Sequence, residues 1–480
     1  MSASSAMDEK RSGIPLVADV DGTLLKTDLL LESYFELLAH RPRKALSAMT
    51  ALKDGKAALK ARLAELALID IATLPLNEDV LAFLKAEKAT GRPLYLASAA
   101  DKRYVEALAA HVPLFNGVFG SEPGLNLAGA SKAKVLCDAF GEGQFDYIGD
   151  APVDEAVWRK ASGVYIANAS SRHLAAVRQW APHAMPIGTR TRGWRDYLKG
   201  LRAHQWLKNI LVFAPALAAH ELGWPLIASV IAFVSFSLCA SSVYILNDLL
   251  DLRGDRAHVR KRQRPFASGR VPLVAGIALV PILLSISLAL ALFLPPAFCA
   301  VLAGYYALTC AYSFLLKRKL LVDVVTLACL YGARLMAGAA AASVVLSPWL
   351  IAFAIFLFLS LALVKRCSEL TDRKQAGSGD PVGRAYRLDD LPLLEIMAVA
   401  SGYVAVLVLA LYVHSDDVRV LYGYPDRLWL LCVPLLYWVS RVSLLTHRGA
   451  MHDDPVIFAV TDRVSQLVAV ICGLVMLASM

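Results

Sequence analysis

Asn247-Asp-Leu-Leu-Asp-Leu-Arg-Gly-Asp255 follows a long apolar segment that runs from about residue 224 to residue 246. Carboxylates at the end of a membrane span are costly and usually functional. On a continuous helix Asp248, Asp251 and Asp255 are spaced i, i+3 and i+7, so their side chains share one face. Such a face suits Mg²⁺ bridged to a substrate diphosphate. The stretch therefore predicts a metal site at the end of a membrane helix, the alternative being a solvated loop with ordinary charges.

Apolar segments continue from this stretch to the C-terminus of the 480-residue chain, so an all-α polytopic bundle is expected. Nine segments are long enough to span a bilayer, namely 207–222, 225–246, 271–292, 296–316, 320–342, 349–365, 393–413, 428–445 and 464–480. The 247–270 and 365–392 loops hold seven and six Lys or Arg residues, which places them in the cytoplasm. An odd number of spans then leaves the C-terminus outside. The net charge of +9 follows from this topology and from phosphate binding, and it does not indicate nucleic-acid binding.

The N-terminal part has a different composition, and a two-domain chain is expected. The predicted divisions are a disordered tail at 1–13, an α/β domain at 14–182, a linker at 183–204 and the membrane domain at 205–480. The N-terminus lacks the basic and then apolar pattern of a signal peptide, so the α/β domain is expected to be cytoplasmic. The membrane would be of the bacterial inner type. The eight cysteines form no C-x-x-C pair and are interpreted as reduced core residues.

Four segments of the α/β domain, taken in order along the chain, carry side chains suited to phosphoryl transfer. The stretch Leu16-Val-Ala-Asp-Val-Asp-Gly-Thr23 presents Asp19, a candidate nucleophile, and Asp21, a candidate acid and base. The strand 93–98 ends in the hydroxyl of Ser98. Lys132 and Lys134 follow a glycine, and the strand 145–150 ends in Gly-Asp with Asp154 four residues later. Open α/β sheets bind ligands at such strand ends.

Together these four segments resemble the motifs of the haloacid dehalogenase-like phosphatase superfamily, and the resemblance covers about residues 14–180. The resemblance implies a Rossmann-like fold, and it implies that the helical stretch at about 29–88 is a substrate-selecting cap. Lys134 fits the motif spacing less well than Lys132. The roles that the resemblance implies are nucleophile and Mg²⁺ ligand for Asp19, acid and base for Asp21, phosphate binding for Thr23, Ser98 and Lys132, and Mg²⁺ binding for Asp150.

Charged and aromatic residues near the ends of other apolar segments are candidate substrate ligands. Lys208, before the first span, is either a topological charge or a phosphate ligand. Tyr312 and Lys317 end the fourth span. Arg334 lies inside the fifth span, where a charge is functional by default and a structural ion pair is the alternative.

A second acidic motif, Lys365-Arg-Cys-Ser-Glu-Leu-Thr-Asp372, follows the sixth span. If it is helical, Lys365, Glu369 and Asp372 share a face. We expect this motif and the aspartates after the second span to face each other and to hold Mg²⁺ and a diphosphate between them.

The motifs N-D-x-x-D-x-x-x-D and R-P-x-x-x-G (Arg264, Pro265 and Gly269) and the second acidic motif resemble the UbiA-type intramembrane prenyltransferase superfamily over about residues 195–480. Most of that superfamily has a second motif close to D-x-x-x-D, whereas this chain has K-R-x-x-E-x-x-D. With R-x-x-Q-W-x-K-N before the first span and D-R-V-x-Q-L at 462–467, the chain is more similar to the decaprenyl-phosphate 5-phosphoribosyltransferases.

This resemblance implies Mg²⁺-dependent transfer of 5-phosphoribosyl from phosphoribosyl diphosphate to a polyprenyl phosphate in the membrane. The fused phosphatase would then remove the 5-phosphate of the product. Substrates with several phosphates need several cations, and the implied substrate ligands are Lys208, Asn247, Arg264, Tyr312, Lys317, Arg334, Lys365, Arg366 and Glu369.

Two other functions remain open. One is transfer from a prenyl diphosphate to an aromatic acceptor such as 4-hydroxybenzoate. The other is a transporter or lipid scaffold whose α/β domain is the only enzyme. Lipid chain length also stays open, as does the oligomeric state, with a homo-oligomer among the alternatives.

Overall fold

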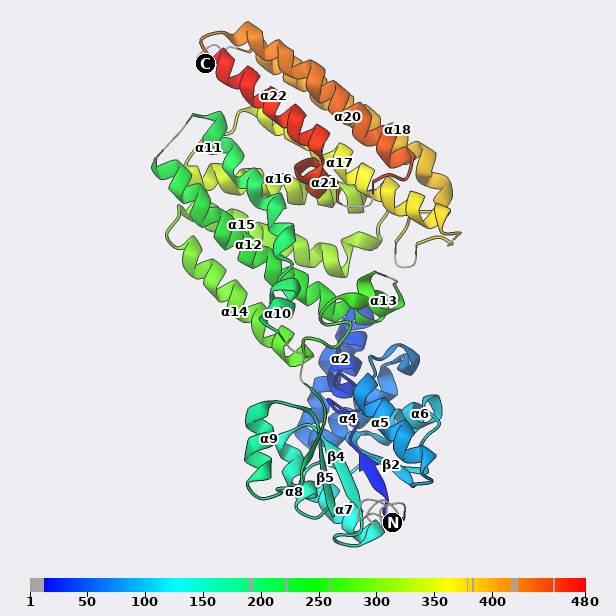
Figure 1. Cartoon of the computed structure of the whole chain (residues 1–480). Coiled ribbons are helices and arrows are strands. Elements are labelled where there is room, and N and C mark those ends of the chain that lie inside the picture. The colour runs from blue at the N-terminus through cyan, green and yellow to red at the C-terminus, as the bar shows by residue number, and fades with distance from the viewer. Residues whose placement is uncertain are drawn as a thin grey trace. The chain divides into compact units, whose positions relative to one another are not determined.

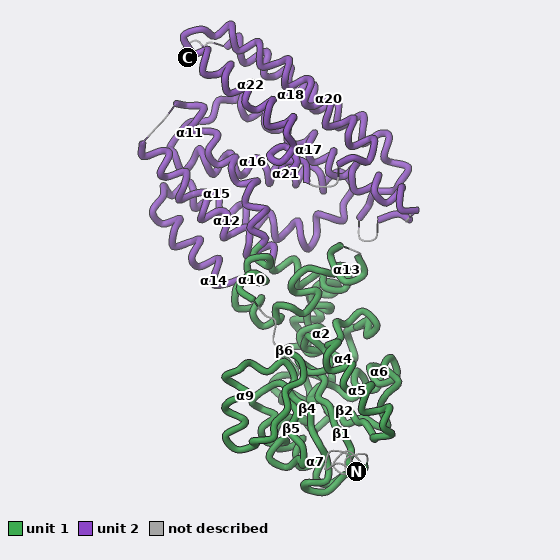
Figure 2. Tube along the Cα trace, viewed as in Figure 1, with its two compact units in different colours: residues 1–201, 245–279 green, residues 202–244, 280–480 purple. Residues whose placement is uncertain are grey.

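The computed structural model describes residues 13–189, 193–220, 223–258, 260–377, 379–381, 384–415, 418, 422–451 and 454–480. Contacts divide the chain into two compact units (Figure 2), one of residues 1–201 with 245–279 and the other of residues 202–244 with 280–480. The chain therefore passes between the units three times. Residues 1–12 of the expected tail lie outside the described part, and the domain boundaries expected near 182 and 205 stay predictions.

The first unit contains a six-stranded parallel sheet with the strand order β3-β2-β1-β4-β5-β6. Its strands are β1 (Leu16–Ala18), β2 (Leu94–Asp101), β3 (Gly117–Ser121), β4 (Asp146–Gly149), β5 (Gly163–Ala169) and β6 (Met185–Thr189). All three residues of β1 are buried because both faces of a parallel sheet are covered by helices. The expected α/β class is confirmed.

Alternate strand residues pack against two helical layers. On one face Leu16 and Leu96 contact α5 (Glu78–Ala89) and α6 (Lys102–His111). On the other face Val17 and Tyr147 pack with α7 (Ala130–Phe140), α8 (Glu155–Trp158) and α9 (Ser171–Arg178). The C-terminal ends of the neighbouring strands β1 and β4 therefore lie side by side in the centre of the sheet.

A helical insertion follows β1 and has its own small core. It comprises α2 (Leu29–His40), α3 (Pro42–Ala48) and α4 (Lys56–Leu66), whose cluster includes Leu37, Leu59 and Leu63. The helix α5 instead packs with the core of the sheet. The part that packs apart from the sheet therefore ends near Leu66, not near residue 88. The unit also contains α10 (Trp194–Gly200) and α13 (Leu252–Ala257).

Seven helices in the described part of the chain are long and apolar enough to cross a membrane, or eight spans if one bent pair counts as a span. They contain α12 (Trp224–Leu250), α14 (Leu273–Ala291), α15 (Pro296–Phe314), α16 (Val322–Ala342), α17 (Pro348–Gln375), α18 (Leu391–Val413) and α20 (Cys432–His447). The bent pair is α21 (Pro455–Thr461) with α22 (Arg463–Ser479), at 77°. The helical bundle is confirmed, and the described residues contain seven or eight candidate spans where about nine were expected.

The difference from nine lies at the two ends of the bundle. The expected first span is a 3-10 helix, Ala203–Phe213, followed by the five-residue α11 (Ala214–Ala218). Neither piece is long enough to cross a bilayer as an α-helix. The expected last span, α22, has 17 residues and qualifies only together with α21.

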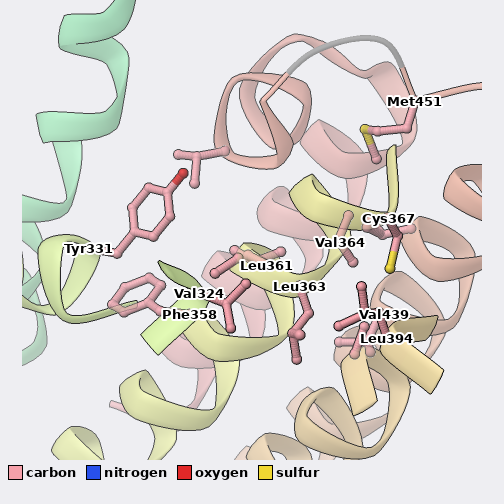
Figure 3. Packing of buried hydrophobic residues seen from close by; sticks show 14 of the residues in the cluster. Val324, Tyr331, Phe358, Leu361, Leu363, Val364, Cys367, Leu394, Val439 and Met451 are labelled. Atoms are coloured by element: carbon pink, nitrogen blue, oxygen red, sulfur yellow. The ribbon is translucent and has the colours of Figure 1, made fainter. Parts of the chain in front are cut away.

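Apolar side chains hold the C-terminal half of the bundle together. Figure 3 shows Tyr331 of α16 beside Phe358 of α17, and their ring centroids lie 5.6 Å apart. Leu394 of α18 and Val439 of α20 belong to the same cluster. In Figure 1 the helices α18, α20 and α22 lie along one another in this region.

Candidate functional site

The end of β1 places Asp19 against a lysine from α7. The ammonium Nζ of Lys132 donates to Oδ1 of Asp19 at 2.8 Å and to the hydroxyl of Tyr147 at 2.8 Å. Tyr147 in turn donates to Oδ1 of Asp154 at 3.0 Å. Burial lowers the pKa of Lys132, but the carboxylates of Asp19 and Asp154 outweigh burial and raise it. Lys132 therefore stays a cation beside the candidate nucleophile.

Three carboxylates from the ends of β1 and β4 could hold a metal ion. One oxygen atom each of Asp19, Asp150 and Asp154 lies within 4.8 Å of the others, and in the described part of the chain no other cluster of three meets this criterion. Hard oxygen ligands of this kind fit Mg²⁺. The turn needs Gly22 at φ +76°, because a Cβ there would lie 2.5 Å from Asp150. The expected ligands Asp19 and Asp150 are therefore together, and Asp154 joins them.

Burial raises the pKa of two acids in this site, Asp21 and Asp154. It raises the pKa of Asp21 well above its usual value, with Asp28 adding to the effect, while the Leu29 amide that donates to Asp21 at 2.9 Å lowers it. Burial also raises the pKa of Asp154 to about 6. A raised pKa makes the Asp21 carboxyl better suited than an ordinary aspartate to donate a proton to a leaving group.

A cavity of about 410 Å³ opens over these residues. Asp19, Asp21, Lys132 and Asp150 line it, together with Lys56 and Lys60 of α4 and several apolar residues of the helical insertion. Lys60 donates to the carbonyl of Ala99 and to Asn126. Neither lysine of α4 is among the predicted site residues, because neither belongs to a motif and only its position in the helical insertion could have indicated it.

Thr23 and Ser98 lie beside the cavity and are not in its lining. The Thr23 hydroxyl donates to Asp150 at 3.3 Å. Ser98 is fully buried, and its hydroxyl accepts the Ala100 amide at 2.9 Å. The strand β2 continues to Asp101, so Ser98 lies inside the strand and not at its end.

The first acidic motif is not one continuous helix, so the expected single face is wrong. The helix α12 ends at Leu250, and Asp251 (φ −106°, ψ 19°) is exposed and precedes α13. Asp248 and Asp255 are nevertheless buried, and Nη1 of Arg264 donates to Asp248 at 3.2 Å and to Asp255 at 2.7 Å. The R-P-x-x-x-G arginine thus joins two aspartates across the break. Asn247 is half-buried on α12.

In the second unit, two predicted lysines share one carboxylate. Lys208 and Lys365 donate to Oδ2 of Asp454 at 2.7 and 2.9 Å, and the hydroxyl of Tyr331 donates to its Oδ1 at 3.0 Å. Arg334 lies nearby in the bundle, fully enclosed, and its Nε donates to Asn209 at 2.8 Å. The sequence suggests only a supporting charge for Asp454 and does not place it in the predicted site, because nothing local shows that an aspartate 246 residues from Lys208 is its partner.

A second polar cluster in this unit surrounds Asp323 at the start of α16. Arg366 and Arg384 pair with its two oxygens at 2.6 and 3.2 Å, and Tyr312 donates to it at 2.8 Å. Arg366 also pairs with Glu369. Lys365 therefore points to Asp454 while Glu369 belongs to this arginine cluster. Lys317 lies in a short 3-10 helix, Leu316–Arg318. Asp323 is not among the predicted site residues, although an acidic residue within an apolar segment could have indicated a functional position.

Comparison with known proteins matches both parts of the chain. The model of the UbiA prenyltransferase family matches residues 210–423. The chain is 34% identical over 458 residues to the uncharacterized protein y4nM of Sinorhizobium fredii, covering 94% of this chain and 88% of that protein. It is 31% identical over 279 residues to decaprenyl-phosphate phosphoribosyltransferase of Mycobacterium tuberculosis, covering 57% of this chain and 90% of that enzyme. A haloacid dehalogenase-family hydrolase of Salmonella enterica covers 37% of this chain and 69% of its own, with 15% identity and a TM-score of 0.27.

Proposed function

Since the chain belongs to the UbiA prenyltransferase family and is a multi-pass membrane protein, we propose that it moves 5-phosphoribosyl from phosphoribosyl diphosphate to a polyprenyl phosphate. The observation that carries the proposal is the 31% identity to a decaprenyl-phosphate phosphoribosyltransferase across 90% of that enzyme. The basic loops would lie on the cytoplasmic side of a bacterial-type inner membrane.

In the transfer, a phosphate oxygen of the lipid attacks C1 of the ribose as the bond from C1 to the diphosphate breaks. The lipid phosphate is already a nucleophile, so the step needs no strong base. Asp248 and Asp255 would hold Mg²⁺, which supplies positive charge to the departing diphosphate. Within the second unit the cations Lys208, Lys365 and Arg366 suit phosphate groups.

We propose further that the α/β domain hydrolyses the 5-phosphate of the lipid product. An oxygen of Asp19 attacks phosphorus, and Asp21 protonates the departing ribose oxygen. Lys132 balances the charge on the phosphoryl group, and a Mg²⁺ ion bound by Asp19, Asp150 and Asp154 would add to this charge balance. Water then releases phosphate from Asp19, with Asp21 accepting its proton.

A double label tests both steps in one tube. Membranes containing the full chain receive Mg²⁺, polyprenyl phosphate and phosphoribosyl diphosphate labelled with ¹⁴C in the ribose and ³²P in the 5-phosphate. Wild type should move ¹⁴C into the lipid and release ³²P as phosphate, whereas Asp19→Asn should leave both labels in the lipid.

A parallel tube with a prenyl diphosphate and labelled 4-hydroxybenzoate tests the aromatic alternative. Label that enters lipid only in this second tube would reject the phosphoribosyl assignment. Release of ³²P by Asp19→Asn at the wild-type rate would reject the phosphatase assignment alone.

A further inference from the structure

A buried ion pair within the first unit joins the helical insertion of the α/β domain to α13. Arg256 of α13 donates from Nη1 and Nη2 to the two oxygens of Glu32 on α2, at 2.9 and 2.6 Å. Each side chain is only 6% exposed. A two-point arginine–carboxylate contact fixes direction as well as distance, because the guanidinium fork is planar and rigid.

Glu32 lies at the start of α2, next to the turn that carries Asp21. The amide of Leu29, the first residue of α2, donates to Asp21 at 2.9 Å. The hydroxyl of Thr27 donates to Glu32, while the carbonyl of Thr27 accepts the Gly22 amide at 3.2 Å. A shift of Glu32 would therefore move the backbone around the candidate acid of the phosphatase.

Arg256 directly follows Asp255, one of the two buried aspartates of the first acidic motif. Its Nε donates to the carbonyl of Ala267 at 2.9 Å, in the loop that begins with Arg264. Arg264 in turn bridges Asp255 and Asp248. The Arg256 side chain thus holds the acidic motif and the R-P-x-x-x-G loop in one arrangement.

A second contact connects the same two segments independently. Gly269, the glycine of R-P-x-x-x-G, has φ +71°, and a Cβ there would lie 2.5 Å from Cβ and 2.6 Å from the carbonyl oxygen of Lys26. Lys26 lies between Asp21 and Thr27. The glycine is therefore required by the phosphatase turn as well as by its own backbone conformation.

We propose that Arg256 and Glu32 are positioning residues that serve both reactions, so that the geometry of the Asp248–Asp255 motif and that of the Asp19–Asp21 turn depend on each other. This inference rests on the proposed function for both reactions, whereas its structural part is judged by hydrogen–deuterium exchange alone. A change in Arg256 should impair the distant phosphatase, and a change in Glu32 should impair transfer. A pair that only stabilises the fold would lower thermal stability without these crossed effects.

The test compares Arg256→Lys, Arg256→Gln and Glu32→Gln in the full-length protein. Lysine keeps the buried charge but cannot reproduce the fork, so this variant should fold. Hydrolysis of p-nitrophenyl phosphate should fall about tenfold in Arg256→Lys, in the range typical of lost supporting contacts. Transfer in an Asp19→Asn background should show a raised KM for phosphoribosyl diphosphate in Glu32→Gln.

The chain offers a matched control on the same two helices. Arg253 and Glu36 form an exposed contact at 3.4 Å, so Arg253→Gln and Glu36→Gln should change neither reaction. Hydrogen–deuterium exchange supplies a readout that needs no activity. Arg256→Lys should speed exchange in peptides that span residues 19–31, whereas Arg253→Gln should not.

Each outcome decides a separate question. If wild type transfers no label, the proposed function fails, and exchange and p-nitrophenyl phosphate hydrolysis still judge the positioning role. If Arg256→Lys folds with wild-type exchange and hydrolysis, the positioning role is rejected whatever the transfer result. Equal effects in the Arg253 control would also reject it.

Discussion

Nζ of Lys132 lies 2.8 Å from Oδ1 of Asp19, the pKa of the lysine is raised, and a second acid, Asp154, is connected to Lys132 through Tyr147. The cation is thus poised where charge would collect on a transferring phosphoryl group. Preorganised charges of this kind contribute strongly because they need no rearrangement during the reaction.

Replacement of Lys132 by Met should lower p-nitrophenyl phosphate hydrolysis by about 10²–10³-fold, the usual cost of losing one such donor. Lys134→Met is the matched control, since Lys134 is exposed on the same helix and should retain wild-type rates. Steady-state kinetics of both variants decide the point, and equal losses in the two would contradict the assignment.

The raised pKa of Asp21 predicts an alkaline limb in the phosphatase rate. Burial favours the protonated carboxyl, so the acid form persists to higher pH than for an ordinary aspartate and is lost as pH rises through the raised pKa. Hydrolysis of an alkyl phosphate, whose leaving group needs a proton, should therefore decline at high pH. Asp21→Asn should slow this reaction and remove the decline, and an unchanged profile in the variant would exclude Asp21 as the acid.

Asp248→Asn should reduce lipid labelling from phosphoribosyl diphosphate below detection, because it removes a buried carboxylate from the expected metal site. Hydrolysis of p-nitrophenyl phosphate should continue in the same preparation. Asp389→Asn, at an exposed position, serves as the control. Labelling by Asp248→Asn at the wild-type rate would refute the metal site.

Asp454→Asn should destabilise the bundle by about 3–5 kcal/mol, because the buried ammonium of Lys208 and the half-buried ammonium of Lys365 would lose their shared counter-charge. Thermal unfolding in detergent measures the loss. Asp426→Asn, at an exposed position in the 3-10 helix Pro425–Leu431, should leave the unfolding temperature unchanged. A smaller loss in the double variant Lys208→Met/Asp454→Asn would identify the unpaired charge as the cause.

The strand-end residues could be predicted from the sequence because parallel strands bring their chain ends to one edge of a sheet. Asp19, Asp150 and Lys132 meet there as expected. The break at Asp251 could not be predicted, since an i, i+3, i+7 spacing describes a helix but does not say where tertiary packing ends it.

The polar clusters of the bundle escaped prediction for a different reason. Asp454 and Asp323 find their partners through packing of distant helices, and sequence spacing carries no such information. The span count was too high because hydropathy does not distinguish the 3-10 helix at Ala203–Phe213 from a membrane helix. The unpredicted ion pairs and the number of spans both depend on the three-dimensional path of the chain, which hydropathy and residue spacing do not give.

The three passages of the chain between its two units have an evolutionary consequence. A gene divided after codon 201 would encode Glu32 in one protein and Arg256 in another. Chain connectivity now keeps these two residues together. In separate proteins the same contact would form only when the two proteins bind each other. We therefore expect that splitting this gene into two would impair the protein, although the two domains follow one another in the sequence. Exchange of the N-terminal domain between relatives should require exchange of residues 245–279 as well.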